Sequence, residues 1–139
     1  MREILFRGKR KGNGKWVYGY LYVRKDGEYE ISHYDEEFDF ERFTYDVFPE
    51  TVEQYTGIVD DNGEKIFDGD ILKVVNSKYK KTYITRVHIY FNTLCVNAYG
   101  KNYEYVPIGF ANELWNDESY KVEIIGNIYD NPELLEVTK

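Results

Sequence analysis

The sequence predicts a mostly β protein, in which an N-terminal β-meander segment is followed by a C-terminal small β-barrel. Along the 139-residue chain, short runs of β-branched and aromatic residues alternate with turn residues, which is typical of antiparallel strands. Tyrosine, which favours strands and amphipathic surfaces, occurs 15 times, beside 8 Phe and 2 Trp. Several turns contain Asn-Gly or Asp-Gly, the dipeptides that fit tight hairpins.

Four strands are expected in the N-terminal half. The clearest is residues 16–23, where large aromatic side chains alternate with smaller residues, so that the aromatic ones share a face. That face consists of Trp16, Tyr18, Tyr20 and Tyr22. The other three strands are expected at residues 4–8, 29–34 and 43–48. The residues that follow, 50–57, are ambiguous between a short strand and a turn-rich link.

A series of turns begins the second half. Asn62-Gly63 can adopt the positive φ angles of a tight turn, and Gly69 can do the same after a short crossing segment. Nearby aspartates can accept hydrogen bonds from backbone N–H groups. Residues 71–76 then read as a half-buried strand. This opening resembles the first strand of an SH3-like barrel, which we expect to span about residues 57–129.

Further strands are expected at residues 82–91, 94–98, 103–108 and 120–129, with one helical turn at 111–115. Gly126 is expected to form a bulge or a close approach. Asn131 followed by Pro132 is typical of a helix start. A boundary near Tyr55 divides the chain into residues 1–55, a β-meander region with an acidic loop, and residues 56–139, an SH3-like barrel region with a short C-terminal helix.

Composition excludes several classes of protein. A single Cys excludes an internal disulfide and any multi-cysteine zinc site, and it suggests a reducing compartment. No apolar run approaches the roughly 20 residues of a membrane helix, and the N-terminus lacks the apolar region of a signal peptide. We therefore expect a cytoplasmic protein without a membrane partner.

Charge is segregated along the chain. Residues 1–25 carry a net +7, residues 26–70 a net −14, residues 71–101 a net +6 and residues 102–139 a net −6. Such alternation predicts complementary surfaces within one subunit or between subunits, although the same charges could simply solvate loops. The segment 35–42 is expected to be an acidic loop with two aromatic anchors, Phe38 and Phe40, which either contact a basic partner or form a solvated insertion.

Five segments in order resemble one known family. They are REILFRGK at 2–9, GKWVYGYL at 14–21, PETVEQYTG at 49–57, DNGEKIFDGDI at 61–71 and EIIGNIYDNPELL at 123–135. Together they resemble the YopX family of phage and prophage proteins. The resemblance implies a phage or prophage origin, a bacterial host and an SH3-like barrel in the C-terminal part. It brings no catalytic residues to transfer.

Catalytic and metal-binding patterns are weak. Cys95 lies one predicted hairpin from His88 on the same predicted face, so a Cys–His dyad is conceivable, but two ordinary strand residues near a turn explain the pattern better. The carboxylates between Asp60 and Asp70 could bind Ca²⁺ or Mg²⁺, yet their spacing does not fit an EF-hand and turn formation accounts for them. We expect no catalytic residues, no metal and no cofactor.

Single-stranded nucleic-acid binding is the alternative function. One basic segment interleaves cations with aromatic residues, as single-strand grooves do. Its residues are Lys78, Tyr79, Lys80, Lys81, Tyr83 and Arg86. A sequence pI near 4.9 opposes this interpretation, because a net negative protein repels phosphate at long range.

The function that the sequence favours is a non-enzymatic protein-binding or assembly module that self-associates. Tyr-rich strand faces suit interfaces, and alternating charge blocks can orient subunits. The candidate self-association residues are Trp16, Tyr18, Tyr20, Phe38 and Phe40. The alternative is that this aromatic face packs on the second half of the same chain.

Overall fold

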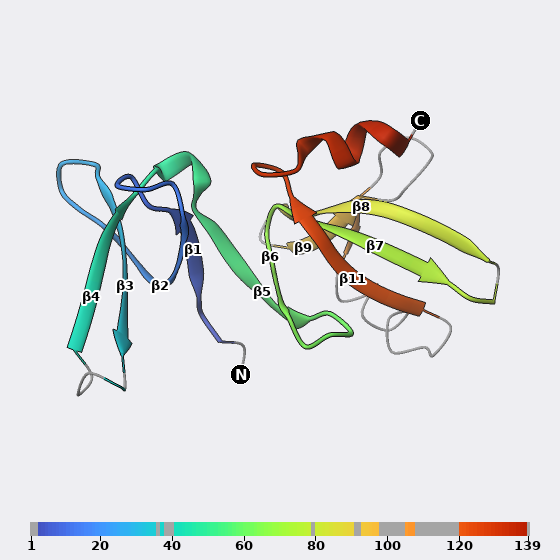
Figure 1. Ribbon diagram of the computed structural model, residues 1–139, viewed down its shortest axis with the longest axis horizontal. Coiled ribbons are helices and arrows are strands. Elements are labelled where there is room, and N and C mark those ends of the chain that lie inside the picture. The colour runs from blue at the N-terminus through green and yellow to red at the C-terminus, as the bar shows by residue number, and fades with distance from the viewer. Residues whose placement is uncertain are drawn as a thin grey trace. The chain divides into compact units, whose positions relative to one another are not determined.

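The computed structural model describes residues 3–35, 37, 41–78, 80–90, 93–97, 105–107 and 120–138. The fold is mostly β with antiparallel sheets, as the sequence predicts (Figure 1). The chain forms two compact units, residues 1–57 and residues 58–139. In the described part of the chain, no helix is long and apolar enough to cross a membrane.

One sheet has six strands in the order β4-β3-β2-β1-β5-β6. These strands are β1 (Phe6–Lys9), β2 (Trp16–Val23), β3 (Tyr29–Asp35), β4 (Glu41–Val47), β5 (Glu53–Val59) and β6 (Lys65–Phe67). A short 3-10 helix, η2 (Pro49–Thr51), connects β4 to β5. The ambiguous segment 50–57 is therefore the end of η2 followed by most of β5, whose Gln54 and Glu53 pair with Phe6 and Arg7.

A second sheet has five strands in the order β10-β9-β8-β7-β11. They are β7 (Asp70–Asn76), β8 (Lys81–Tyr90), β9 (Thr93–Asn97), β10 (Tyr105–Pro107) and β11 (Tyr120–Asn127). The C-terminal 3-10 helix η3 (Pro132–Thr138) follows β11. The predicted helix start is thus confirmed, although the helix is 3-10. The predicted helical turn at 111–115 and half of the predicted acidic loop, including Phe38 and Phe40, lie outside the described residues. The two ends of that predicted loop are strand instead, because Asp35 belongs to β3 and pairs with Glu41 of β4, which also includes Arg42.

The N-terminal unit is a curled sheet. Beyond β1, the chain bridges to β4 at Arg10 and Val47, and the Phe48 N–H donates to the Lys9 carbonyl over 2.9 Å. The enclosed core contains Ile31 and Val47, which are fully buried. A Cβ at Gly8 would lie 3.2 Å from atoms of both side chains, so glycine lets β1 pass close to this core.

The C-terminal unit has its own apolar core. Buried residues from β6, β7, β8 and β11 form it, and they are Ile66, Leu72, Val74, Val87 and Val122. Burial of such side chains is the main favourable contribution to the stability of the unit. β6 is the crossing segment that the sequence predicts between two turns.

The predicted turns of the opening stretch are confirmed. Gly63 has a φ of 81° and its N–H donates to the Asp60 carbonyl over 3.0 Å, while Gly69 has a φ of 89°. Gly126 lies at the register shift in β11, as expected for a bulge. A Cβ there would lie 2.5 Å from Asn131 Oδ1, so this position also brings the chain close to the start of η3.

Candidate functional site

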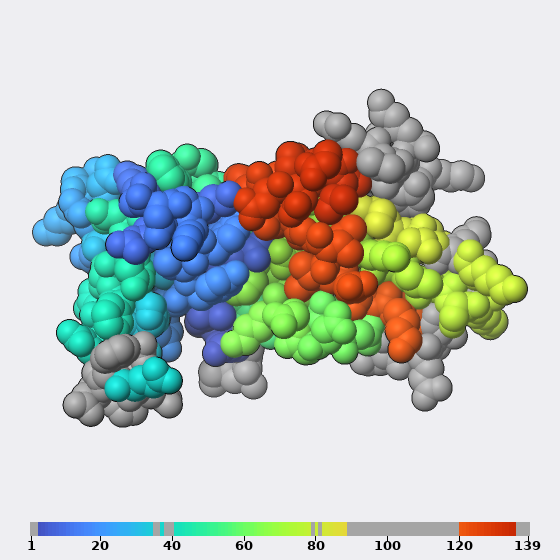
Figure 2. Space-filling view, viewed as in Figure 1, coloured from blue at the N-terminus to red at the C-terminus, as the bar shows by residue number. Residues whose placement is uncertain are grey.

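Four tyrosines form an exposed aromatic surface on the N-terminal unit, which we call the tyrosine face. They are Tyr18, Tyr20, Tyr22 and Tyr34, with exposed fractions of 46%, 60%, 59% and 58%. The first three alternate along β2, and the fourth lies on β3. Figure 2 shows the outer surface of this unit in blue and cyan. Clustered exposed aromatic residues are the composition that protein interfaces favour.

Strand register orders this surface into cross-strand rows. Tyr20 lies opposite Ser32, which lies opposite Thr44 on β4. In the next row, Tyr22 lies opposite Glu30, which lies opposite Asp46. Because paired residues point to the same side of a sheet, each row places an aromatic ring beside polar groups. We call the row of Tyr22, Glu30 and Asp46 the acidic row.

Gly19 shapes β2 in the middle of the tyrosine face. A Cβ at this position would collide with the backbone carbonyl of Ser32 on β3. Glycine therefore lets the two strands approach closely between Tyr18 and Tyr20. Any larger residue would push β2 away from β3 and disturb the spacing of the tyrosines.

Trp16 belongs to the predicted aromatic face but is half-buried rather than exposed. The guanidinium carbon of Arg7 lies 4.7 Å from the centre of its ring, and Lys9 Nζ lies 5.4 Å from it. Cations over an aromatic face stabilise it by cation–π attraction. Trp16 therefore holds this end of the sheet together, and the three tyrosines after it form the exposed part.

A hairpin turn at residues 24–28 borders the acidic row. Asp26 accepts hydrogen bonds from the Glu28 N–H and the Arg24 guanidinium, and these lower the pKa of the Asp26 carboxyl. The same contact with Asp26 raises the pKa of Arg24. Since the pKa of Asp26 is depressed, the contact stabilises the turn above the ordinary aspartate pKa and is lost as the pH falls through the lowered value.

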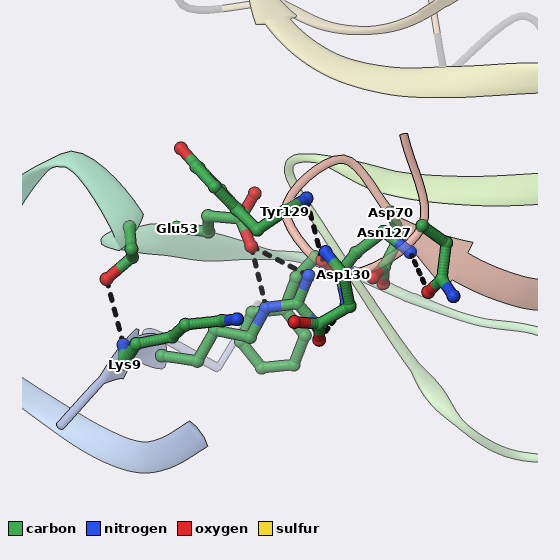
Figure 3. A network of polar contacts seen from close by, with 10 residues as sticks. Lys9, Glu53, Asp70, Asn127, Tyr129 and Asp130 are labelled. Carbon is green, nitrogen blue, oxygen red and sulfur yellow. Dashed lines mark hydrogen bonds and ion pairs between the residues drawn. The ribbon is translucent and has the colours of Figure 1, made fainter. Parts of the chain in front are cut away.

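Several basic residues of the N-terminal block pair inside their own unit. Arg7 and Glu53 form a buried ion pair, with Nη2 2.7 Å from Oε1. Lys11 Nζ lies 2.6 Å from Glu28 Oε2, and this hydrogen bond raises the pKa of Lys11. Figure 3 shows Glu53 with its ion pair and Lys9, whose backbone N–H donates to the Thr51 hydroxyl over 2.8 Å. Part of the predicted complementarity between charge blocks is thus intramolecular.

The basic segment of the alternative function is divided by the strand geometry. Lys78 and Lys80 are exposed in the turn between β7 and β8, whereas Tyr79 and the side chain of Lys81 lie outside the description. Tyr83 packs against the core of the C-terminal unit. Arg86, three positions further along β8, lies on the opposite sheet face and is half-buried. The turn therefore exposes its lysines, but Tyr83 and Arg86 do not join them on one surface.

Strand pairing places His88 directly opposite Cys95 across β8 and β9. The sequence prediction that these residues share one sheet face is confirmed by this register.

The aspartates of the opening stretch accept backbone hydrogen bonds. Asp60 Oδ1 accepts from the N–H groups of Asn62 and Glu64, and Asp70 Oδ2 accepts from the Phe67 N–H over 2.7 Å. These contacts agree with the turn-forming interpretation. Among the described residues, no group of three or more His, Cys, Asp or Glu side chains could hold a metal ion.

Sequence reasoning missed the acidic row and Tyr34. The alternation in residues 29–34 assigns each side chain to one of the two faces of the strand. Only the register between β3 and β4 shows that Glu30 and Asp46 are opposite each other. Tyr34 could have been predicted from the sequence, because it lies two residues after Ser32 in a predicted strand and therefore on the same face as Ser32.

Comparison with known proteins defines the family. The family model described as YopX protein matches residues 5–136, nearly the whole chain. The chain belongs to the YopX family. The resemblance expected from the five sequence segments is therefore confirmed.

A solved YopX structure has a similar fold. The crystal structure of protein YopX from Bacillus subtilis has a TM-score of 0.59 and 17% sequence identity, and the match covers 96% of this chain and 98% of that chain. At this identity the similarity shows the fold alone. The search of curated proteins finds no match for this YopX family member.

Proposed function

We propose that this YopX family member is a non-enzymatic protein-binding or assembly module, and that the tyrosine face is its contact surface. The observation that supports it is the exposure of Tyr18, Tyr20, Tyr22 and Tyr34 on one side of a sheet with its own core. Tyrosine supplies contact area with little loss of conformational freedom, and it is enriched where proteins bind.

The same proposal includes self-association, as predicted from the charge blocks, and the cytoplasm of a bacterial host as the compartment of a phage or prophage protein. Closure of residues 56–139 into an SH3-like barrel also belongs to it. Assignment of strand pairs between residues 98 and 119 by nuclear magnetic resonance tests the barrel. Strand pairs that leave both edges of the β10-β9-β8-β7-β11 sheet open would contradict it.

Replacing Tyr20 and Tyr22 by serine is expected to abolish partner capture. Each lost ring removes apolar contact area at the centre of the proposed surface, and truncating such residues typically weakens binding by about 30-fold or more. The measurement is affinity capture from a bacterial host lysate, quantified against the wild-type protein. Folding of the variant is checked by circular dichroism.

Two control variants accompany this experiment. Serine at Ile4 and Val59, which are also exposed, removes apolar area elsewhere and leaves capture intact. Alanine at Cys95 and His88 also leaves it intact, since the proposal assigns them no catalytic role. Equal capture by the wild-type protein and the Tyr20→Ser, Tyr22→Ser variant would reject the tyrosine face as the contact surface.

Single-stranded nucleic-acid binding is the second proposal, supported by the exposure of Lys78 and Lys80 at a hairpin tip. It predicts that a fluorescent single-stranded DNA binds at low salt, that affinity falls steeply as salt rises, and that Lys80→Glu with Lys81→Glu removes binding. Fluorescence anisotropy measures this, with Lys15→Glu plus Lys121→Glu as the charge-matched control. If the wild-type protein gives no anisotropy change at low salt, this function is excluded.

A further inference from the structure

The acidic row brings two like charges together on an exposed sheet. Glu30 and Asp46 lie directly opposite each other in the β3–β4 register, and Asp46 has a side chain that is 57% exposed. Like charges directly opposite each other destabilise a sheet. Two cations of the same unit compensate in part. Arg24 Nη1 is 3.8 Å from Asp46 Oδ1 while its Nη2 binds Asp26, and Lys11, whose Nζ binds Glu28, is also attracted by Asp46. A further cation at the row would reduce the remaining repulsion between the two carboxylates.

Aromatic rings beside this row suit a cation as well. Tyr22 lies opposite Glu30, and Tyr20 is two residues away on the same side of β2. Elsewhere in the same unit, Arg7 lies over the ring of Trp16, and Arg10 lies 4.5 Å from the centre of the Tyr45 ring. A lysine or arginine that reaches the acidic row would gain ion-pair and cation–π attraction together.

The chain also carries a basic element at a hairpin tip. Residues 71–101 include six basic and no acidic residues. Asn76 is the last paired residue of β7, with Lys81 and Tyr120 as its partners, so Ser77, Lys78 and Lys80 lie beyond the paired strands. In Figure 2 the yellow-green atoms of this segment lie at an outer edge of the C-terminal unit. We call Ser77, Lys78 and Lys80 the basic turn.

One hydrogen bond and one left-handed residue define the backbone of the basic turn. The Asn76 side-chain carbonyl accepts a hydrogen bond from the Lys78 N–H over 3.0 Å. Lys80 has a φ of 53°, the left-handed conformation that tight turns use. Two exposed lysines thus lie on a short turn with a defined backbone conformation. Their two positive charges are equal in number to the two carboxylates of the acidic row.

We propose that the tyrosine face binds the basic turn of a second copy of this chain. This inference rests on the proposed function, since it names the partner of that surface. Lys78 and Lys80 pair with Glu30 and Asp46, and their stems cover the rings of Tyr20 and Tyr22. Because each copy carries one face and one turn, the contact is head-to-tail and produces either a closed ring or an open chain of copies.

The test is a charge exchange measured by sedimentation at low ionic strength. The wild-type protein is expected to sediment as a species heavier than the 16.6 kDa chain. The face variant, Glu30→Lys with Asp46→Lys, and the turn variant, Lys78→Glu with Lys80→Glu, each place like charges in contact. Each variant alone is expected to lose association by at least about 100-fold, and an equimolar mixture is expected to associate again.

Three controls separate this contact from general effects of charge and folding. Glu64→Lys with Glu133→Lys, and Lys15→Glu with Lys121→Glu, change the net charge equally at exposed positions and keep the association. Circular dichroism checks the fold of each variant. Tyr20→Ser with Tyr22→Ser weakens association without changing any charge, so it tests the face even if the charge variants fold poorly.

Three results would overturn the inference. They are a wild-type monomer at micromolar concentration, association that neither charge variant changes, and a mixture of the two variants that stays monomeric. A monomer that still captures a host protein through Tyr20 and Tyr22 would remove self-association from the proposed function and leave its protein-binding part standing with a different partner. A monomer whose basic turn binds single-stranded DNA would assign the turn to nucleic acid instead.

Discussion

Replacing Glu53 by glutamine is expected to destabilise the N-terminal unit by about 3–5 kcal/mol. The Arg7 and Glu53 side chains are only 7% and 4% exposed, and Arg7 Nε lies 2.8 Å from Glu53 Oε1. Removing the carboxylate charge leaves the Arg7 guanidinium buried without its counter-charge, at a strand pair that joins β1 to β5. Denaturant unfolding followed by the fluorescence of Trp16, which contacts Arg7, measures the loss.

A second variant separates the buried charge from the packing. Arg7→Met with Glu53→Leu removes both charges and is expected to recover most of the stability, because replacing a buried ion pair by apolar groups is often neutral. Glu50→Gln, at an exposed position in the neighbouring 3-10 helix, is the control and changes stability by less than about 0.5 kcal/mol. A Glu53→Gln protein within about 1 kcal/mol of wild type would contradict the assigned role of the pair.

Replacing Asp60 by alanine is expected to destabilise the C-terminal unit by about 3 kcal/mol. Asp60 is buried, and its Oδ1 accepts from the N–H groups of Asn62 and Glu64, both over 2.9 Å. Its Oδ2 accepts from the Ile124 N–H of β11 over 3.0 Å. Alanine removes both acceptor oxygens and with them all three hydrogen bonds, and hydrogen bonds to a charged group are stronger than neutral ones.

Hydrogen exchange locates this effect. The Ile124 amide is expected to exchange faster in Asp60→Ala, since its bond to the carboxylate is gone. Asp61→Ala is expected to cost less than Asp60→Ala, because it removes one hydrogen bond, from the Val122 N–H to the exposed Asp61 carboxylate, and the N–H of residue 61 still donates to the Val122 carbonyl over 3.0 Å. An unchanged exchange rate at Ile124, together with unchanged stability, would show that Asp60 does not hold β11.

Local pattern explains why so much of the strand order could be predicted. The strand at residues 16–23 has the predicted bounds, because its period-two alternation and flanking turns are properties of neighbouring residues. β5 was ambiguous for the opposite reason. Glu53 reads as a loop residue by itself, and it becomes a strand residue only because Arg7, 46 positions away, neutralises its charge in the core.

The candidate site was predicted in part. Alternation placed Tyr18, Tyr20 and Tyr22 on one face, but it cannot tell which face of a sheet is exposed to water. The pairing of Glu30 with Asp46 follows from strand register, which depends on the turns and on burial of the opposite face. For the basic segment, the sequence grouped Tyr83 with Arg86, whereas the strand places them on opposite faces.

By itself, the sequence determined the family, the mostly β class, the order of the clearest strands and the turns at glycines 63 and 69. Those features depend on residue spacing and on backbone conformations that are local. Tertiary structure alone decided that Arg7 pairs with Glu53, that Trp16 is held by cations while the tyrosines after it face solvent, and that two carboxylates meet in the acidic row. The physical reason is that burial and charge pairing depend on contacts between distant segments, which residue spacing does not contain.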